Sequence, residues 1–173
     1  MRIMMNSTRI MSPGLWLPLV LAIMVAACGF QLRGSHLEPL KNSSVYIKST
    51  GASSLVSQLK KQLAFAEVPV VMDAGQAEYI IEVGGESFKR SVLSVSAQTG
   101  KVEEYELTYN ISFTIMGPEG KVLLKNEPVT TRRDFTFDED SVLGKYDEEN
   151  KLREDITRYA ADTILRRLQS VTR

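Results

Sequence analysis

Cys28 and His36 carry the side chains most often used for nucleophilic catalysis or metal binding, and the chain has one of each. Zinc sites draw on clusters of cysteine and histidine, which one residue of each type does not supply. His36 stands alone in a polar stretch, so we expect it to be solvated. The sequence contains neither a G-x-G-x-x-G fingerprint nor a Walker A loop. It therefore predicts no catalytic residue, no metal site and no enzymatic activity.

Acidic residues occur close together at Glu103-Glu104 and at Asp138-Glu139-Asp140. A pair of carboxylates can act as acid and nucleophile in glycoside hydrolysis. Acids are also common on solvated loops and at helix starts, and we favour that interpretation. An envelope hydrolase is thus the least favoured alternative. A pocket that holds two carboxylates with raised pKa values would support it.

Basic residues are better candidates for binding, because Lys and Arg pair with phosphates and carboxylates. The candidates, expected beside a wet sheet surface or at its ends, are Lys89, Arg90, Lys101, Arg132, Arg133 and Lys145. For any one of them, a solvated and charge-balanced surface is the alternative. The chain has 21 basic and 21 acidic residues, so it lacks the basic excess of a general nucleic-acid binder. We expect no nucleic-acid partner.

The segment before Cys28 has the pattern of an export signal. Arg2 and Arg9 are its charged residues, and Leu15–Ala27 is an apolar run interrupted by Pro18. A helix of that length covers roughly 20 Å, which is short of the ~30 Å hydrocarbon core of a membrane. A basic start, a short apolar centre and small residues at the end are typical of a secretory signal peptide. A buried core helix is the alternative.

The end of this segment, Val25-Ala26-Ala27-Cys28, resembles the lipobox of bacterial lipoproteins. That resemblance implies a diacylglycerol on the Cys28 sulfur and an acyl chain on its freed amine, with no other cofactor. Two or more chains hold a protein firmly on a membrane, whereas one holds it marginally. Gly29 is not the aspartate of an inner-membrane retention signal, so we expect the outer membrane. The domains expected are a cleaved signal peptide (1–27), a lipidated tether (28–43) and one folded domain (44–173).

The folded domain is expected to open with a short strand and a helix. Residues 44–48 are rich in β-formers, and Thr50-Gly51 is expected to cap the helix that follows. The apolar residues of that helix recur at helical spacing. They are Leu55, Val56, Leu59, Leu63 and Ala66.

Three long strands come next. Residues 79–95 read as a strand with a bulge or bend at Gly84-Gly85, and a turn follows at 97–101. Residues 105–115 alternate between apolar and polar side chains, which predicts a strand with one buried and one wet face. The third strand, 121–137, contains Pro128, which favours an edge position or a bulge.

A loop at 138–146 is expected to lead into a final amphipathic helix, with acidic residues 147–149 near its start. The order is β-α-β-β-β-α. Two amphipathic helices and a sheet with one apolar face bury each other's apolar surfaces. The sequence therefore predicts an α/β (α+β) two-layer sandwich, with a mostly antiparallel sheet and two helices packed on one face.

The residues after the lipobox also resemble a known family. Cys28-Gly29-Phe30-Gln31-Leu32-Arg33 resembles the C-G-[aromatic]-x-L-R start of mature LptE, the lipopolysaccharide (LPS)-assembly lipoprotein family of the Gram-negative outer membrane. The resemblance spans the mature chain in the same element order. Further matching segments are Gln98-Thr99-Gly100, Glu104-Tyr105, Phe135–Asp138, Leu143–Lys145, Ala160-Ala161 and Leu165–Leu168.

The resemblance implies a role inside the large β-barrel LptD, where members of this family act as a plug, help the barrel assemble and assist LPS transport to the outer leaflet. It also implies LPS binding through basic residues. Lys145 stands where family members also carry a lysine. Gln98 stands where some relatives have arginine, and Lys101, three residues on, can supply the charge. A polar sheet face would suit a polar barrel lumen.

A free-standing periplasmic lipid-binding lipoprotein is the alternative function. Such a carrier needs a closed apolar cavity, and the sequence offers apolar faces for one core only. A deep apolar pocket in the structure would favour the carrier over the plug.

Overall fold

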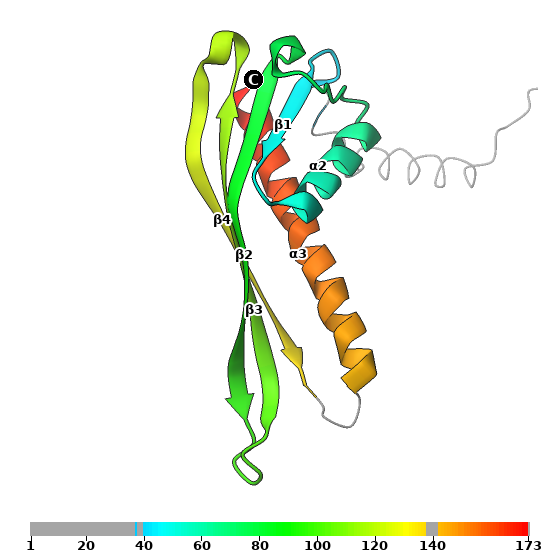
Figure 1. The fold of residues 1–173 in the computed structure, drawn as a ribbon, viewed down its shortest axis with the longest axis vertical. Coiled ribbons are helices and arrows are strands. Elements are labelled where there is room, and N and C mark those ends of the chain that lie inside the picture. The colour runs from blue at the N-terminus through cyan, green and yellow to red at the C-terminus, as the bar shows by residue number, and fades with distance from the viewer. Residues whose placement is uncertain (1–36, 38–39, 138–141, 173) are drawn as a thin grey trace, which may run out of the picture. The chain divides into compact units, whose positions relative to one another are not determined.

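The structure, a computed structural model, describes residues 37, 40–137 and 142–172, with the side chains of all but 142–146 (Figure 1). Cys28 and His36 lie outside this part of the chain. The strands are β1 (Val45–Ser49), β2 (Tyr79–Val95), β3 (Val102–Met116) and β4 (Val122–Thr136), and the helices are α2 (Ser53–Phe65) and α3 (Val142–Val171). This confirms the predicted β-α-β-β-β-α order, with short 3-10 turns at Ala74–Gln76 and Pro118–Gly120.

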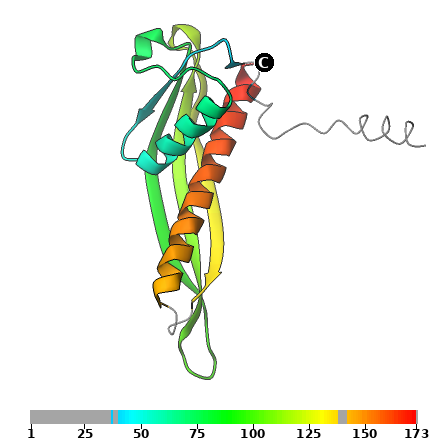
Figure 2. The same ribbon diagram turned by 90° about the vertical axis from the view of Figure 1, so that its right-hand side faces the viewer.

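The four strands form one sheet in the order β1-β2-β3-β4. β1 runs parallel to the start of β2, while β2, β3 and β4 are antiparallel to their neighbours. Figure 2 shows both helices on the same face of this sheet, with α2 packed beside α3. The predicted two-layer sandwich with a mostly antiparallel sheet is therefore confirmed.

Two irregularities in the sheet were also predicted. The pairing of β2 with β3 shifts register between Gly84 and Ser87, and Gly85 has a φ of 70°, which favours glycine. Pro128 lies in β4, opposite Ser112 of β3, so it sits on an edge strand. An edge position tolerates proline because the outward backbone group needs no partner in the sheet.

The core lies between the helices and the inward face of the sheet. The alternation in β3 is confirmed, because Leu107, Tyr109, Ile111, Phe113 and Ile115 are all buried. The helices supply Leu55, Leu59, Leu63, Ile156, Ala160, Ile164 and Leu168. Burial of each large apolar side chain contributes about 1.5–3 kcal/mol. Leu37 and Leu40, within the stretch expected to be a tether, are buried in this core as well.

The start of α2 differs from the expectation. Ala52 is the N-cap residue and α2 has no side-chain cap. The N–H of Thr50 donates to the carbonyl of Val83, 3.2 Å away, so Thr50 continues the pairing of β1 with β2 and does not cap the helix. The Oγ of Ser49 accepts from the N–H of Ala52 at 3.2 Å. The cap prediction was wrong because the Thr50 backbone bonds to β2 and the helix begins only at Ser53, after Ala52.

The start of α3 also differs. The loop expected at 138–146 is wrong in its second half, since α3 begins at Val142 and includes Lys145. Gly144 lies within this helix, where a glycine costs only about 1 kcal/mol relative to alanine. No acidic residue lies in the first turn of α3. Residues 147–149 therefore lie further into the helix than predicted.

Candidate functional site

Side chains at successive positions of a strand point to opposite faces of the sheet. The two members of each adjacent basic pair, Lys89-Arg90 and Arg132-Arg133, therefore lie on different faces. Lys89 of β2 pairs with Thr108 of β3, which pairs in turn with Arg132 of β4. Arg90 and Arg133 fall in the next row, which lies on the side of the helices. All four had been expected beside wet sheet surface. Only Lys89 and Arg132 lie on the open face, opposite the helices.

The open face carries polar and charged side chains in rows that cross three strands. Next to the row of Lys89 lie two further rows in register, Ser87–Asn110–Thr130 and Ser91–Glu106–Asp134. The Thr130 hydroxyl donates to Oδ1 of Asn110 at 2.9 Å, and the Thr108 hydroxyl donates to Oε1 of Glu106 at 3.0 Å. This face is a polar, hydrogen-bonded surface, and α2 and α3 both lie on the other side of the sheet (Figure 2).

Lys89 and Arg132 are the exposed cations at the two ends of their row. Neither has an ion-pair partner within the described part of the chain. Strands lie about 4.8 Å apart, so the backbones that carry the two residues are separated by about 10 Å. Two exposed cations at this spacing, with a hydroxyl between them, can pair with anionic groups of a ligand.

Arg90 is engaged on the opposite face. Its Nη1 donates to Oε2 of Glu149 in α3 at 3.1 Å, and its guanidinium lies 4.8 Å from the centre of the Tyr105 ring. Arg153 donates to Oε1 of Glu149 at 3.0 and 2.8 Å and stacks on Phe88 at 4.7 Å. The Glu149 side chain is only 12% exposed. One carboxylate therefore ties β2 to α3 through two arginines.

Arg133 likewise faces the helices. Its guanidinium lies 5.8 Å from the centre of the Tyr159 ring of α3. Its Nη1 donates to the backbone carbonyl of Arg132 at 2.8 Å. Its contacts therefore hold β4 near α3 rather than presenting a cation to solvent on the open face.

The two remaining candidates, Lys101 and Lys145, lie at the β2–β3 hairpin and near the start of α3. Lys101 ends the predicted turn between β2 and β3, where its backbone N–H donates to the Thr99 hydroxyl at 3.3 Å. Gln98 accepts from the Ser96 hydroxyl at 3.2 Å in the same turn. The tip of this hairpin and the start of α3, which contains Lys145, lie toward the same end (Figure 1). The side chain of Lys145 is outside the described ones.

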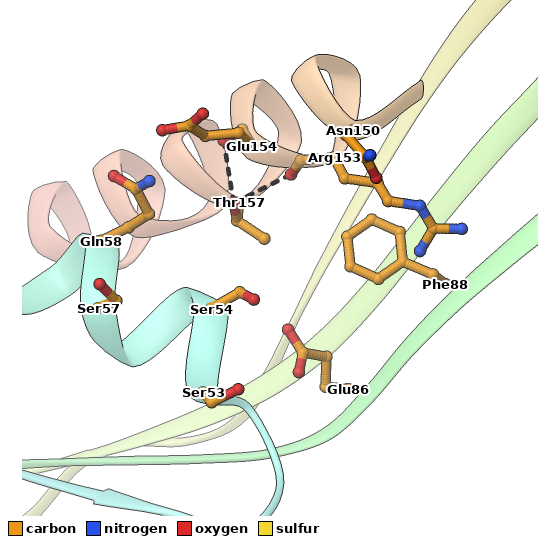
Figure 3. Close-up of a pocket in the computed structure, with 10 residues that line it drawn as sticks. All are labelled: Ser53, Ser54, Ser57, Gln58, Glu86, Phe88, Asn150, Arg153, Glu154 and Thr157. Carbon is orange, nitrogen blue, oxygen red and sulfur yellow. Dashed lines mark hydrogen bonds between the residues drawn. The ribbon is translucent and has the colours of Figure 1, made fainter. Parts of the chain in front are cut away.

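A cavity of about 620 Å³ lies between the start of α2, the middle of β2 and α3 (Figure 3). Its lining is mostly polar: Ser53, Ser54, Ser57, Gln58, Glu86, Phe88, Asn150, Arg153, Glu154 and Thr157. Arg153 covers a face of Phe88, the aromatic ring among them. No motif in the sequence pointed to this cavity, because its walls come from three separate segments. It is open to solvent and is not the closed apolar cavity that an acyl chain requires.

Tyr109 lies behind this cavity, fully buried, with its ring 4.5 Å from that of Phe88. Its hydroxyl donates to Oε1 of Glu86 at 2.9 Å. Burial, and then the hydrogen bond and negative charge of Glu86, raise the pKa of Tyr109 far above its usual value. The hydroxyl therefore stays protonated and serves as a structural donor.

Among the described residues, no three or more His, Cys, Asp and Glu side chains come together in a group that could hold a metal ion. In the same part of the chain, no helix is both long and apolar enough to cross a membrane.

The two-layer fold is shared by small bacterial lipoproteins of known structure. A lipoprotein B from Nitrosomonas europaea matches with a TM-score of 0.68 and 26% identity, over 83% of this chain and 92% of that one. The rare lipoprotein B from Shewanella oneidensis matches with a TM-score of 0.64 and 27% identity, over 73% of this chain and 94% of that one. The fold thus defines a class of envelope-associated lipoprotein domains.

Within that class, the chain belongs to the LptE family. The family model for LptE, described as lipopolysaccharide-assembly, matches residues 37–168. The LPS-assembly lipoprotein LptE of Photorhabdus laumondii is 29% identical over 161 residues, which cover 91% of this chain and 86% of that protein. The resemblance found in the sequence is therefore confirmed. The family consists of non-enzymatic lipoproteins of LPS assembly that use no cofactor.

Proposed function

We propose that this chain is an outer-membrane lipoprotein that plugs the LptD β-barrel, helps it assemble and assists LPS transport to the outer leaflet. The observation that supports this most is the open polar face of the sheet, with its rows of hydroxyl, amide and charged side chains. The lumen of an outer-membrane barrel is polar. A polar surface whose groups can exchange water for lumen side chains suits that environment, whereas an apolar face would not.

We also propose that LPS binds through basic residues of this chain. LPS carries anionic groups, and Lys and Arg pair with phosphate and carboxylate. Lys89 and Arg132 are the candidates that the geometry favours, since both are exposed and without an ion pair among the described residues. Lys101 and Lys145 stay candidates for a contact at the hairpin end. Arg90 and Arg133 are weaker candidates because each already contacts α3.

A lipid on Cys28 would hold the domain at the periplasmic side of the outer membrane. The Cys28→Ala chain should remain an unlipidated precursor, so its mass should lack the diacylglycerol and acyl chains and its membrane fractionation should change. Cys28 is the single cysteine of the chain, so no other thiol can replace it. An unchanged mass together with unchanged fractionation would refute the anchor.

A free-standing lipid carrier is less well supported. A carrier surrounds acyl chains with apolar side chains. The cavity between α2, β2 and α3 is open to solvent, and Phe88 is the one apolar residue among those that line it. The polar cavity and the polar open face both favour a protein that works against another protein's polar surface.

Purification of the tagged full chain from a detergent-solubilised outer-membrane fraction tests the central proposal. A large β-barrel protein, identified by mass as LptD, should co-purify in a fixed ratio and should be lost from the membrane when this chain is depleted. Recovery of the chain without any barrel, or normal barrel assembly after depletion, would overturn the plug. LPS binding by Lys101→Ala with Lys145→Ala, unchanged from the original chain, would remove those two residues from the candidate list.

A further inference from the structure

β2 has a long edge without a neighbouring strand. β1 pairs only with Tyr79–Val83, whereas β3 pairs along the other edge of β2 as far as Val95. From Gly84 to Val95, no strand of the described chain lies on the β1 side (Figure 1). The backbone N–H and C=O groups of an open edge are a template for another strand.

The middle of this edge is regular. Ser87 to Val92 pair with Asn110 to Tyr105 of β3 without a register shift, and two shifts follow between Val92 and Val95. A regular stretch of that length matches a typical strand, which has five or six residues. An added strand therefore has enough ordered backbone to pair with.

Exposed apolar side chains gather at the far end of the same edge. Val92, Leu93 and Val95 are 53%, 49% and 54% exposed. From Ser91 to Ser96 the strand carries no charge and no proline. Apolar side chains along an open strand edge attract further strands, and proteins usually remove them when no partner exists.

β4, the other long edge of the sheet, has features that discourage pairing. Pro128 removes one backbone donor, and Asn126 adopts a φ of 51° at a register shift with β3. Lys125 and Arg132 add charge along it. Bulges, proline and basic residues are the usual devices that protect an edge. β4 carries all three devices, whereas β2 has neither a proline nor a register shift with β3 between Ser87 and Val92.

We propose that the edge of β2 from Ser87 to Val95 accepts an extended segment of the β-barrel partner as an added strand. This inference rests on the proposed barrel partnership. A closed barrel has no free strand edge, so the segment comes from a loop or a terminal stretch of that protein. Main-chain hydrogen bonds supply the affinity in this mode, and pockets for alternate side chains supply the specificity.

Charge favours a different protein over a second copy of this chain. Lys89 is exposed and has no ion-pair partner among the described side chains, so an added strand should not place a cation beside it. Pairing of β2 with β2 of a second copy would bring two Lys89-Arg90 pairs close together. Like charges that face each other across strands are destabilising.

Hydrogen exchange of the lipidated full chain, alone and in the co-purified barrel complex, tests the inference. Amides between Ser87 and Val95 that face the open edge should exchange at least tenfold more slowly in the complex, and those that face β3 should change little. A complex in which the edge amides exchange as fast as in the isolated chain would overturn strand addition and leave the plug intact. If no barrel co-purifies, the proposed function fails, and the inference fails with it.

Substitution of the exposed apolar residues provides a second test. Val92→Lys with Leu93→Lys places charges on the edge and should lower the recovered barrel at least tenfold. Val122→Lys is the matched control, since Val122 is 50% exposed on the protected edge strand β4, and its recovery should equal that of the original chain. Equal recovery by both variants would contradict the proposal. Concentration-dependent dimers of the isolated chain, with the same amide protection, would overturn the choice of partner.

Discussion

Similar residues have opposite environments on the two faces of the sheet. Lys89 and Arg90 are neighbours in β2, yet Lys89 points to the open face and Arg90 to the helices. Arg90 meets a largely buried carboxylate and an aromatic ring, whereas Lys89 has no ion pair in the described structure. A basic residue on this sheet is therefore either part of the internal packing or available to a ligand, and the period of the strand decides which.

The difference extends to the polar side chains. On the covered face, polar groups also join the sheet to a helix far along the chain, as when Arg90 of β2 donates to Glu149 of α3. On the open face, hydroxyls and amides bond to their neighbours in the sheet, as Thr130 does to Asn110. Substitutions on the covered face should thus lower stability, and those on the open face should lower binding.

The largest contrast is expected for adjacent residues of β3. Tyr109→Ala should lower the free energy of unfolding by about 3–5 kcal/mol, because it empties a fully buried aromatic site and leaves Glu86 without its donor. Asn110→Ala, on the open face, should lower it by less than about 1 kcal/mol. Urea titration followed by circular dichroism measures both. Similar losses for the two variants would refute the division between the faces.

The next contrast concerns ligand binding. Lys89→Ala with Arg132→Ala should weaken LPS binding about tenfold, or about 1.4 kcal/mol, with a smaller dependence on salt than the original chain. Arg90→Ala with Arg133→Ala should bind LPS nearly as the original chain does, since those cations already contact α3. Titration of LPS micelles at two salt concentrations distinguishes the pairs. A stronger effect of the Arg90 and Arg133 variant would reverse the assignment.

The pH dependence of stability above pH 10 should report on the covered face. The pKa of Tyr109 is raised in the folded chain, so above pH 10 the unfolded state loses a proton that the folded state retains. Stability should therefore be unaffected by this group below pH 10 and should fall above it by about 1.4 kcal/mol per pH unit. Burial also raises the pKa of Tyr79, which adds to the same fall.

Tyr109→Phe serves as the control for this effect. It removes the titrating hydroxyl while it keeps the ring, so unfolding free energies measured between pH 8 and 11 should decline less steeply. An equal slope for Tyr109→Phe and the original chain would show that Tyr109 does not contribute.

The smallest contrast compares the two neighbours in β2. Arg90→Ala should cost about 1 kcal/mol of unfolding free energy, because Glu149 keeps Arg153 as a partner and Arg90 is itself 46% exposed. Lys89→Ala should stay within about 0.5 kcal/mol of the original chain. Thermal unfolding of both variants at one salt concentration checks this. A larger loss for Lys89→Ala would place a structural contact on the open face.

Much of the architecture follows from local patterns. The alternation in β3, the glycine pair in β2, the position of Pro128 and the apolar stripes of both helices each predicted the element that the structure contains. The failures fall where local signals compete with longer-range pairing. Thr50 resembles a helix cap, but its backbone N–H pairs with Val83 of β2, more than thirty residues further along the chain. The other failure is the expected loop at 138–146, of which the last five residues belong to α3.

The candidate site was predictable only in part. The sequence identified the basic residues and, through the family resemblance, the function that they could serve. It did not place Lys89 opposite Arg132, because that depends on the register of β2, β3 and β4. It did not assign Glu149 to two arginines either, because its position along α3 suggested only an effect on the helix dipole.

The sequence by itself determined the class of fold, the amphipathic faces and the resemblance to LPS-assembly lipoproteins, because periodicity and motifs are properties of neighbouring residues. Only the tertiary structure decided which cations share the open face, which cation of the sheet pairs with the Glu149 carboxylate, and which strand edge stays unpaired. Those outcomes depend on strand register and on where α3 crosses the sheet. Both are set by packing between segments that are distant in the chain, and no local pattern records them.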